Sequence, residues 1–271
     1  MIHRQTTRSL IKGWWTVVPI IVLVVVWASR SVDLTRLPFM PDATWSRVHH
    51  SGVLRVATDA SYPPLASLTT QGEFVGMDVD VAKAIADCMG VRLEMVNVSW
   101  DGLFDALHAG KADLVISAVP YDGTLTRDLH YSPPYADLGL VLVVRDGVTP
   151  AEGFAGDTVV VELGSEAHLY ARRLASKTGW PSLIVVDSTA DLRDVLADGR
   201  ANMAICDRVS AGQLALAGVS IALPPLVSEP VHVVTERSAG RLGTEVAECL
   251  VARKADGGLD RIIERWLGGA E

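Results

Sequence analysis

Short apolar strands alternate with amphipathic helices along most of the chain, and this order constrains the fold more than any other feature. In the first half, apolar runs at 54–58, 93–98 and 112–117 are separated by helical patterns at 78–90 and 100–110. A strand–helix–strand–helix–strand order predicts a parallel sheet with helices packed on its faces. The expected fold class is therefore α/β.

The second half of the chain repeats this order, so we expect two lobes of the same construction. Ligands of open α/β sheets bind beyond the carboxyl ends of the parallel strands. Two such lobes facing each other would therefore enclose a binding site between them. The second set has strands expected at 158–163, 183–186 and 201–206 and helices expected at 166–177 and 189–199.

An apolar segment without charges runs between Lys12 and Arg30, and three basic side chains precede it. This arrangement is typical of a secretory signal, and the basic residues are expected to stay on the cytoplasmic side. The run is short for a membrane span and Val26-Trp27-Ala28 resembles a cleavage site, whereas tryptophans at its ends suit an uncleaved helix. We expect 1–28 to be a signal peptide or a membrane anchor.

Composition indicates an exported globular body with an acidic balance. Residues 29–50 contain Pro38 and Pro41 and show little periodicity, which predicts a linker. The first fifty residues carry 6 basic and 2 acidic side chains, and the remainder carries 18 basic and 30 acidic ones. This excess argues against a nucleic-acid partner. The body is expected in the periplasm or at the outer face of the cytoplasmic membrane, where an uncleaved N-terminal helix would tether it.

The three cysteines, Cys88, Cys206 and Cys249, lie far apart and have no CxxC spacing. The spacing indicates neither a zinc site nor a disulfide framework, so we interpret all three as small buried hydrophobic side chains. The histidines are scattered without metal-ligand spacing. No metal or other cofactor is expected.

Five blocks of the sequence carry a resemblance to a known family. Their order and spacing resemble the amino-acid-binding, type 2 periplasmic binding proteins of ABC transporters (solute-binding protein family 3), over about 52–268. The resemblance implies two lobes joined by two hinge strands: lobe 1 from 51–138 and 226–271, and lobe 2 from 139–225. The hinges are expected near 138–143 and 222–226. The blocks are LRVATDASYPP (54–64), FVGMDVD (74–80), SWDGL (99–103), YSPPY (131–135) and DGGLDRIIERWLG (256–268).

The resemblance also implies where lobe 1 contacts the ligand. Asp59 and Tyr62 follow the first strand, where the family contacts the ligand side chain, and Trp100 opens the second helix. An aromatic wall suits the apolar stem of an amino acid, although Tyr62 and Trp100 can equally be packing aromatics. Ser117 and Ala118 end the third strand and are expected at the floor of the cleft.

In lobe 2, two positions suit the charged groups of an amino acid. Gly164-Ser165-Glu166 joins a strand to a helix N-terminus, where free N–H groups and the helix dipole favour a carboxylate. Asp207 follows a buried strand and matches the carboxylate that pairs with the ligand's α-ammonium in the family. The alternative is that Asp207 is a helix N-cap.

The chain departs from the family pattern where the family binds the ligand's carboxylate. Counted without gaps, Leu125 occupies the position of the usual arginine, and Arg127 follows two places later. Pro120 stands where a backbone N–H commonly helps, and proline has none. Arg127 reaches the ligand only if the turn is shortened, and otherwise is a surface ion-pair residue.

The expected function is capture of an amino acid or similar small polar solute by a monomeric binding protein that presents it to an ABC permease. No covalent chemistry is required. A second hypothesis is an exported enzyme on the same fold, resembling cyclohexadienyl dehydratases, with Glu166, His168 or Asp207 as proton donor. A third is a ligand-sensing subunit that works through a separate partner.

Overall fold

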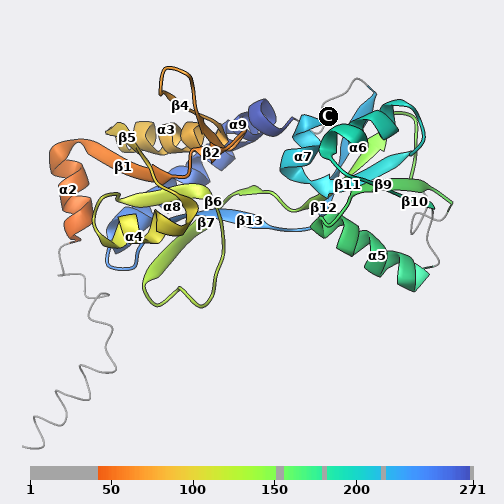
Figure 1. Ribbon diagram of the computed structural model, residues 1–271. Helices are drawn as coiled ribbons and strands as arrows, with labels where there is room; N and C mark the ends of the chain where they lie inside the picture. The colour runs from red at the N-terminus through yellow and green to blue at the C-terminus, as the bar shows by residue number, and fades with distance from the viewer. Residues whose placement is uncertain (1–41, 151–155, 179–181, 215–217, 269–271) are drawn as a thin grey trace, which may run out of the picture. The chain divides into compact units, whose positions relative to one another are not determined.

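The computed structural model describes residues 42–150, 156–178, 182–214 and 218–268 (Figure 1). All helices and strands described here belong to one compact unit, which begins at residue 43. The apolar run at 14–28, expected to be a signal peptide or an anchor, lies outside the described residues. No helix of the described part has the length and apolar character that crossing a membrane requires.

The first lobe is built on a five-stranded sheet of order β5-β1-β6-β13-β7. β1 pairs in parallel with β5 and β6, and β13 runs antiparallel to β6 and β7. Apolar side chains of β1 and of helices α3 and α8 share one core, in which Leu54, Ile85 and Val246 are buried. The strands are β1 (Val53–Thr58), β5 (Arg92–Asn97), β6 (Leu114–Pro120), β7 (Leu129–Asp137) and β13 (Pro230–Glu236). The helices are α2 (Ala43–Ser51), α3 (Met77–Met89), η2 (Trp100–Gly102), α4 (Leu103–His108), α8 (Gly240–Ala255) and α9 (Gly258–Leu267).

A small three-stranded antiparallel sheet follows β1, with order β2-β3-β4. Its strands are β2 (Ser61–Tyr62), β3 (Ala66–Leu68) and β4 (Phe74–Val75). It carries the chain from β1 to α3. Its first strand brings Tyr62 beside the end of β1, where the candidate site lies.

The second lobe has a sheet of order β10-β9-β11-β8-β12. β9 pairs in parallel with β10 and β11, and β8 runs antiparallel to β11 and β12. Buried Val160 and Leu196 lie in one of its cores. The strands are β8 (Leu140–Arg145), β9 (Thr158–Glu162), β10 (Ser182–Val186), β11 (Met203–Asp207) and β12 (Val219–Val227). The helices are α5 (Glu166–Thr178), α6 (Thr189–Ala197) and α7 (Arg208–Gln213).

Both sheets place their parallel strands in the same order, which confirms the two-lobed α/β fold expected from the sequence. The sheets are mixed rather than purely parallel, because each also contains antiparallel pairs. These pairs involve the strands that connect the two lobes, which are β7 and β13 in the first sheet and β8 and β12 in the second. Ser188 caps α6, because its Oγ accepts a hydrogen bond from the Asp191 N–H. The apolar pattern indicated the strands, but it did not reveal the direction of the connecting ones.

Helix α2 occupies the last part of the segment for which the sequence predicted a linker. Its Val48 is fully buried in the same core as Leu54. Arg47 forms an ion pair with Asp113, whose carboxylate also pairs with Arg55 at 2.9 Å. Trp45 also packs against this core, and its ring centre lies 4.8 Å from the Arg241 guanidinium. Only Val48 of this nine-residue helix is fully buried, so a search for apolar periodicity finds little.

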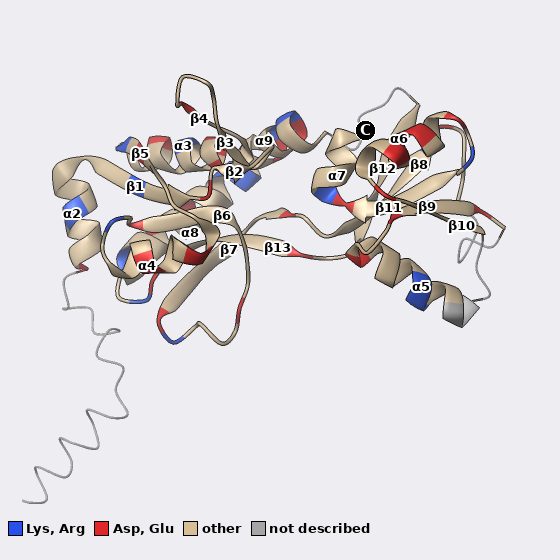
Figure 2. Ribbon diagram, in the orientation of Figure 1, with Lys and Arg blue, Asp and Glu red and all other residues tan. Residues whose placement is uncertain are grey.

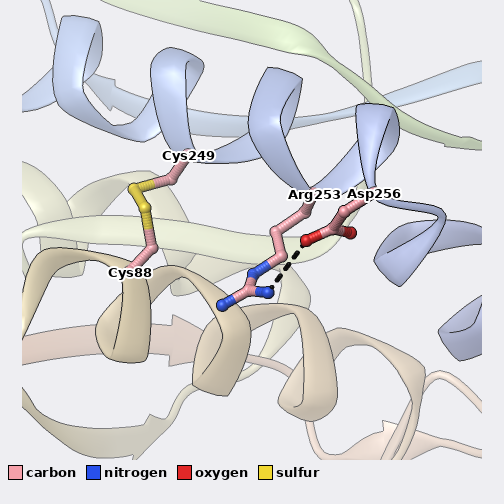
Figure 3. Close-up of a disulfide and its surroundings, with 4 residues drawn as sticks. All are labelled: Cys88, Cys249, Arg253 and Asp256. Carbon is pink, nitrogen blue, oxygen red and sulfur yellow. Dashed lines mark hydrogen bonds and ion pairs between the residues drawn. A yellow bond between two sulfur atoms is a disulfide. The ribbon is translucent and has the colours of Figure 1, made fainter.

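The expectation that all three cysteines are unpaired hydrophobic residues is wrong for two of them. Cys88 on α3 and Cys249 on α8 form a disulfide with a Cα–Cα distance of 5.9 Å (Figure 3). The partners are 161 residues apart in sequence, and only the packing of α3 against α8 brings them together. Cys206 is free and buried, as expected.

The chain passes between the sheets twice, from β7 to β8 and from β12 to β13. At this crossing the Asp137 carboxylate accepts hydrogen bonds from the Gly139 and Glu229 N–H groups and from Ser228 Oγ, at 3.0, 2.9 and 2.6 Å. The two segments approach so closely that a Cβ on Gly139 would lie 1.9 Å from the Val227 carbonyl oxygen. Glycine is therefore required at position 139.

Candidate functional site

A cavity of about 370 Å³ lies at the carboxyl ends of β1 and β6, and we call it the first cavity. The loop after β1, the start of η2, and the segments following β7, β11 and β12 contribute to its walls. This is the edge at which an α/β sheet binds ligands. The lining residues are Asp59, Ser61, Tyr62, Leu65, Asp78, Trp100, Ser117, Ala118, Leu138, Asp207, Val209, Glu229 and Val231.

Asp59 organises the loop that forms one wall of the first cavity. Its carboxylate accepts hydrogen bonds from the Ser61 hydroxyl at 2.6 Å and from the Trp100 N–H at 2.8 Å. Its own N–H donates to Ser117 Oγ at 3.1 Å, which joins the ends of β1 and β6. The hydrogen bonds from Ser61 hold the pKa of Asp59 below its ordinary value, against the effect of burial. Asp59 therefore remains a carboxylate.

Two aromatic side chains line the cavity and remain open to solvent. Tyr62 is 56% exposed and Trp100 is 50% exposed. Packing aromatics are normally covered, so this exposure favours the interpretation that they contact a ligand. Burial raises the pKa of the Tyr62 hydroxyl, and the charges of Asp207 and Glu229 raise it further. Tyr62 therefore stays protonated and can donate a hydrogen bond.

The floor of the first cavity contains a buried carboxyl group that the sequence analysis did not single out as a site residue. Asp78 is 1% exposed, and its Oδ1 accepts a hydrogen bond from the Tyr135 hydroxyl at 2.7 Å. Burial raises the pKa of Asp78 to about 7, although the bond from Tyr135 acts in the opposite direction. The Tyr135 oxygen also accepts the Ala118 N–H at 3.0 Å. Ala118 has a φ of 50°, a left-handed value that is unusual for a residue other than glycine.

A second cavity, of about 220 Å³, lies at the start of α5 and the end of β11. It shares Asp207 and Glu229 with the first cavity. Ser165 and Glu166 line it as expected, while Gly164 lies next to it with a φ of +78°. The lining residues are Leu140, Glu162, Ser165, Glu166, Ala167, Ile205, Cys206, Asp207, Ser210 and Glu229.

Asp207 lies in both cavities and is also a helix N-cap, the alternative that the sequence left open. Its Oδ1 accepts the Ser210 N–H at 2.8 Å and its Oδ2 accepts the Ser210 hydroxyl at 2.7 Å. Each carboxylate oxygen can accept more than one hydrogen bond. The capping role therefore leaves Asp207 able to bind a ligand cation.

Arg127 is not brought to this site. It is exposed in the turn between β6 and β7 and lines neither cavity. The six other predicted residues of the first cavity, from Asp59 to Asp207, do come together there. Sequence reasoning missed Glu162 and Glu229. Glu162 ends strand β9, so its position at a carboxyl strand end was a usable signal, whereas Glu229 lies in the returning crossing and gave none.

Negative charge dominates the lining of both cavities. Figure 2 shows acidic residues at the end of β11 and on the segment leading into β13. Burial raises the pKa of Glu229, and the nearby charges of Glu166, Asp137 and Asp207 raise it further. No lysine, arginine or histidine lies among the described residues that line either cavity. The site therefore presents uncompensated carboxylates to a ligand.

The chain matches the bacterial extracellular solute-binding proteins, family 3, over residues 54–269. Because this match covers most of the chain, the protein belongs to that family. It is a solute-binding protein whose candidate site lies at the strand ends, where the residues above are gathered. The match spans both lobes and both crossings between them.

The relatives include enzymes as well as binding proteins. The chain is 27% identical over 179 residues to cyclohexadienyl dehydratase of Pseudomonas aeruginosa, a match that covers 61% of this chain and 63% of the enzyme. It is 23% identical over 233 residues to a probable amino-acid ABC transporter-binding protein of Haemophilus influenzae, covering 82% of this chain and 87% of that protein.

Solved structures show the same architecture. An ancestral cationic amino acid solute-binding protein, AncCDT-1, is 27% identical and superposes with a TM-score of 0.63, covering 83% of this chain and all of that one. The match extends over both lobes. The fold expected from the sequence is thus also that of solved solute-binding proteins.

Proposed function

We propose that this protein captures an amino acid or a similar small amine-bearing solute in the first cavity and delivers it to an ABC permease. The observation that carries the proposal is the cavity itself, which lies at the strand ends and takes residues from the segments of both sheets. Family membership and the amino-acid ABC transporter-binding relative support it. The permease is the expected partner, and the binding protein is expected to act as a monomer.

The protein acts outside the cytoplasm under this proposal. Disulfides persist in oxidising compartments such as the periplasm, and Cys88–Cys249 supports that location. The basic residues before the apolar run at 14–28 favour a cytoplasmic N-terminus, which would place the rest of the chain outside the cytoplasm. The protein is released or tethered according to whether this segment is cleaved.

The first cavity supports reversible binding rather than turnover. Asp59 in its wall is held by hydrogen bonds from Ser61 and Trp100, which fix the loop rather than activate a nucleophile. Cyclohexadienyl dehydratase remains the specific alternative, because the chain resembles that enzyme over 179 residues. Release of a dehydrated or hydrolysed product during incubation with a bound ligand would support the enzyme instead.

Asp207 is assigned to the ligand's ammonium group. In the variant Asp207→Asn the amide oxygen keeps the helix cap, while the negative charge is lost. Hydrogen bonds to charged groups contribute about 1.5–3 kcal/mol, so affinity should fall by about 10- to 150-fold. Arg127→Ala is the matched control and should bind normally, because Arg127 lines neither cavity.

The measurement is a calorimetric titration of the full chain with the best ligand from a thermal-shift panel of amino acids and amines. A ligand present at a hundred times its Kd should stabilise the protein by about 2.7 kcal/mol. Unchanged affinity in Asp207→Asn would overturn the ammonium assignment. The absence of saturable binding by every member of the panel would overturn the proposed function.

A further inference from the structure

The two cavities together form a strongly acidic site whose charges are not neutralised by the protein. Five carboxylates besides the buried Asp78 line them: Asp59, Glu162, Glu166, Asp207 and Glu229. The ion pairs of the described residues leave all five without a lysine, arginine or histidine partner. A ligand entering this site must itself supply positive charge.

The arginine and the backbone N–H groups that the sequence analysis considered for a ligand's carboxylate are absent or already used on the side of lobe 1. The Ala118 N–H donates to Tyr135, and Pro120 has no N–H. Arg127 is exposed in its turn and lines neither cavity. A free carboxylate placed here would meet Asp59 rather than a cation.

The backbone of lobe 2 is engaged in a similar way. The Gly164 N–H donates to the His168 Nδ1 at 3.1 Å, and the Ser165 N–H to the Glu162 carbonyl at 3.3 Å. Ser165 Oγ accepts the His168 N–H. The carboxylate of Glu166 stands at the same helix start and would repel an anion. Three N–H groups of the anion site that the sequence predicted at this loop, those of Gly164, Ser165 and His168, are therefore occupied by the protein's own groups.

Arg208 is the cation nearest in sequence to Asp207, and it is directed elsewhere. Its side chain is 6% exposed, and its guanidinium donates to the Gly268 carbonyl at 2.5 Å. It lines neither cavity. The acidic charge of the site is therefore left for the ligand to neutralise.

The distribution of the charges indicates an organic cation rather than a metal ion. No three histidine, cysteine or acidic side chains of the described residues come together as metal ligands would. The carboxylates instead lie along two cavities that meet at Asp207 and Glu229. The exposed faces of Tyr62 and Trp100 add surfaces that bind ammonium or guanidinium groups through cation–π contacts.

From these observations, and on the basis of the proposed function, we infer that the ligand is an elongated organic cation with two positively charged nitrogen groups and that binding does not require a carboxylate. One charged group would lie near Asp207 and Glu229, where the two cavities meet. The other would lie near Asp59 with Tyr62 and Trp100, or near Glu162 and Glu166. Diamines and guanidino-amines have this chemistry.

Matched ligand pairs separate the two parts of the inference. Agmatine is arginine without its carboxylate, and cadaverine is lysine without its carboxylate. Citrulline has the carboxylate of arginine but a neutral side chain. Calorimetric titration of the full chain should show agmatine and cadaverine binding as tightly as their parent amino acids or more tightly. Citrulline should bind at least about tenfold more weakly than arginine.

Charge-removing variants test the site itself. Glu229→Gln should weaken the binding of agmatine or cadaverine by about tenfold or more, and so should either Asp59→Asn or Glu166→Gln, according to which cavity holds the second charged group. Glu248→Gln removes an exposed carboxylate on α8 outside both cavities and should bind normally. Melting temperatures of the ligand-free variants show whether each variant folds. If Glu229→Gln does not fold, Asp207→Asn removes a neighbouring negative charge and replaces it in the test.

The possible results distinguish this inference from the proposed function. If agmatine and cadaverine both bind more than tenfold more weakly than arginine and lysine, a carboxylate is recognised and the inference is wrong, while solute binding stands. If the protein prefers a neutral or acidic amino acid, the inference is also wrong and solute binding also stands. If no amine or amino acid binds, both proposals fail.

Discussion

Among single residues, Asp78 shows most clearly how burial changes the protonation of a carboxyl group. Its carboxyl group is buried beneath the first cavity and hydrogen-bonded to Tyr135. Its pKa of about 7 means that the folded protein keeps a proton that the unfolded chain, with an ordinary value of 3.8, has lost. Between about pH 4 and 7 the folded state therefore binds more protons, and stability falls as pH rises.

This linkage gives a prediction for Asp78→Asn. The amide keeps an oxygen for the Tyr135 hydroxyl and cannot ionise. Between pH 5 and pH 8 the wild-type protein should lose about 2–3 kcal/mol more unfolding free energy than the variant does. Urea unfolding at both pH values measures the difference. Asp105→Asn, on the exposed face of α4, is the control, and an identical pH dependence in Asp78→Asn and wild type would contradict the assignment.

The elements that decide the geometry of the site are the two crossing segments. Asp137 accepts hydrogen bonds from Ser228 and Glu229. Burial acts to raise the pKa of Asp137, but the hydrogen bonds from Ser228, Glu229 and Gly139 together lower it below its ordinary value. Glu229 lines both cavities, so the same contact sets the position of an acidic wall. Packing at the crossing therefore fixes the position of Glu229 in the walls of both cavities.

Gly139→Ala tests the close approach at the crossing. The new Cβ would lie 1.9 Å from the Val227 carbonyl oxygen, so the backbone must move. We expect a loss of about 1–3 kcal/mol in unfolding free energy, measured by urea titration. Gly240→Ala, at a helical position with nothing within 4 Å of the added methyl group, should be neutral or slightly stabilising. Equal stabilities of the two variants would refute the role of Gly139.

At the scale of the whole molecule, the Cys88–Cys249 disulfide ties together two segments that lie on either side of lobe 2 in the sequence. The loop that it closes spans 161 residues and contains all of lobe 2. A crosslink that closes a long loop restricts the unfolded chain strongly. It thereby stabilises a lobe that is assembled from two distant parts of the chain.

Reduction of this disulfide should lower the unfolding free energy by about 2–5 kcal/mol. Urea unfolding with and without reductant, together with a thiol count in the denatured protein, measures the effect. Burial raises the pKa of the Cys206 thiol well above its ordinary range, so this thiol should not exchange. Cys206→Ala should therefore respond to reductant as the wild type does. Three free thiols in the untreated protein would contradict the disulfide.

The sequence by itself determined the two-lobed fold and six of the residues that line the first cavity. Apolar periodicity and strand–helix order are local, so they placed Asp59 and Asp207 at the carboxyl ends of strands, and the family resemblance assigned both residues to the ligand site. Only the tertiary structure decided the rest. The disulfide, the buried Asp78 and the acidic wall at Glu229 depend on contacts between residues far apart in the chain. The distance between Cys88 and Cys249 in the folded protein decides that they pair, and burial raises the pKa of Asp78 and of Glu229. No local sequence pattern encodes either quantity.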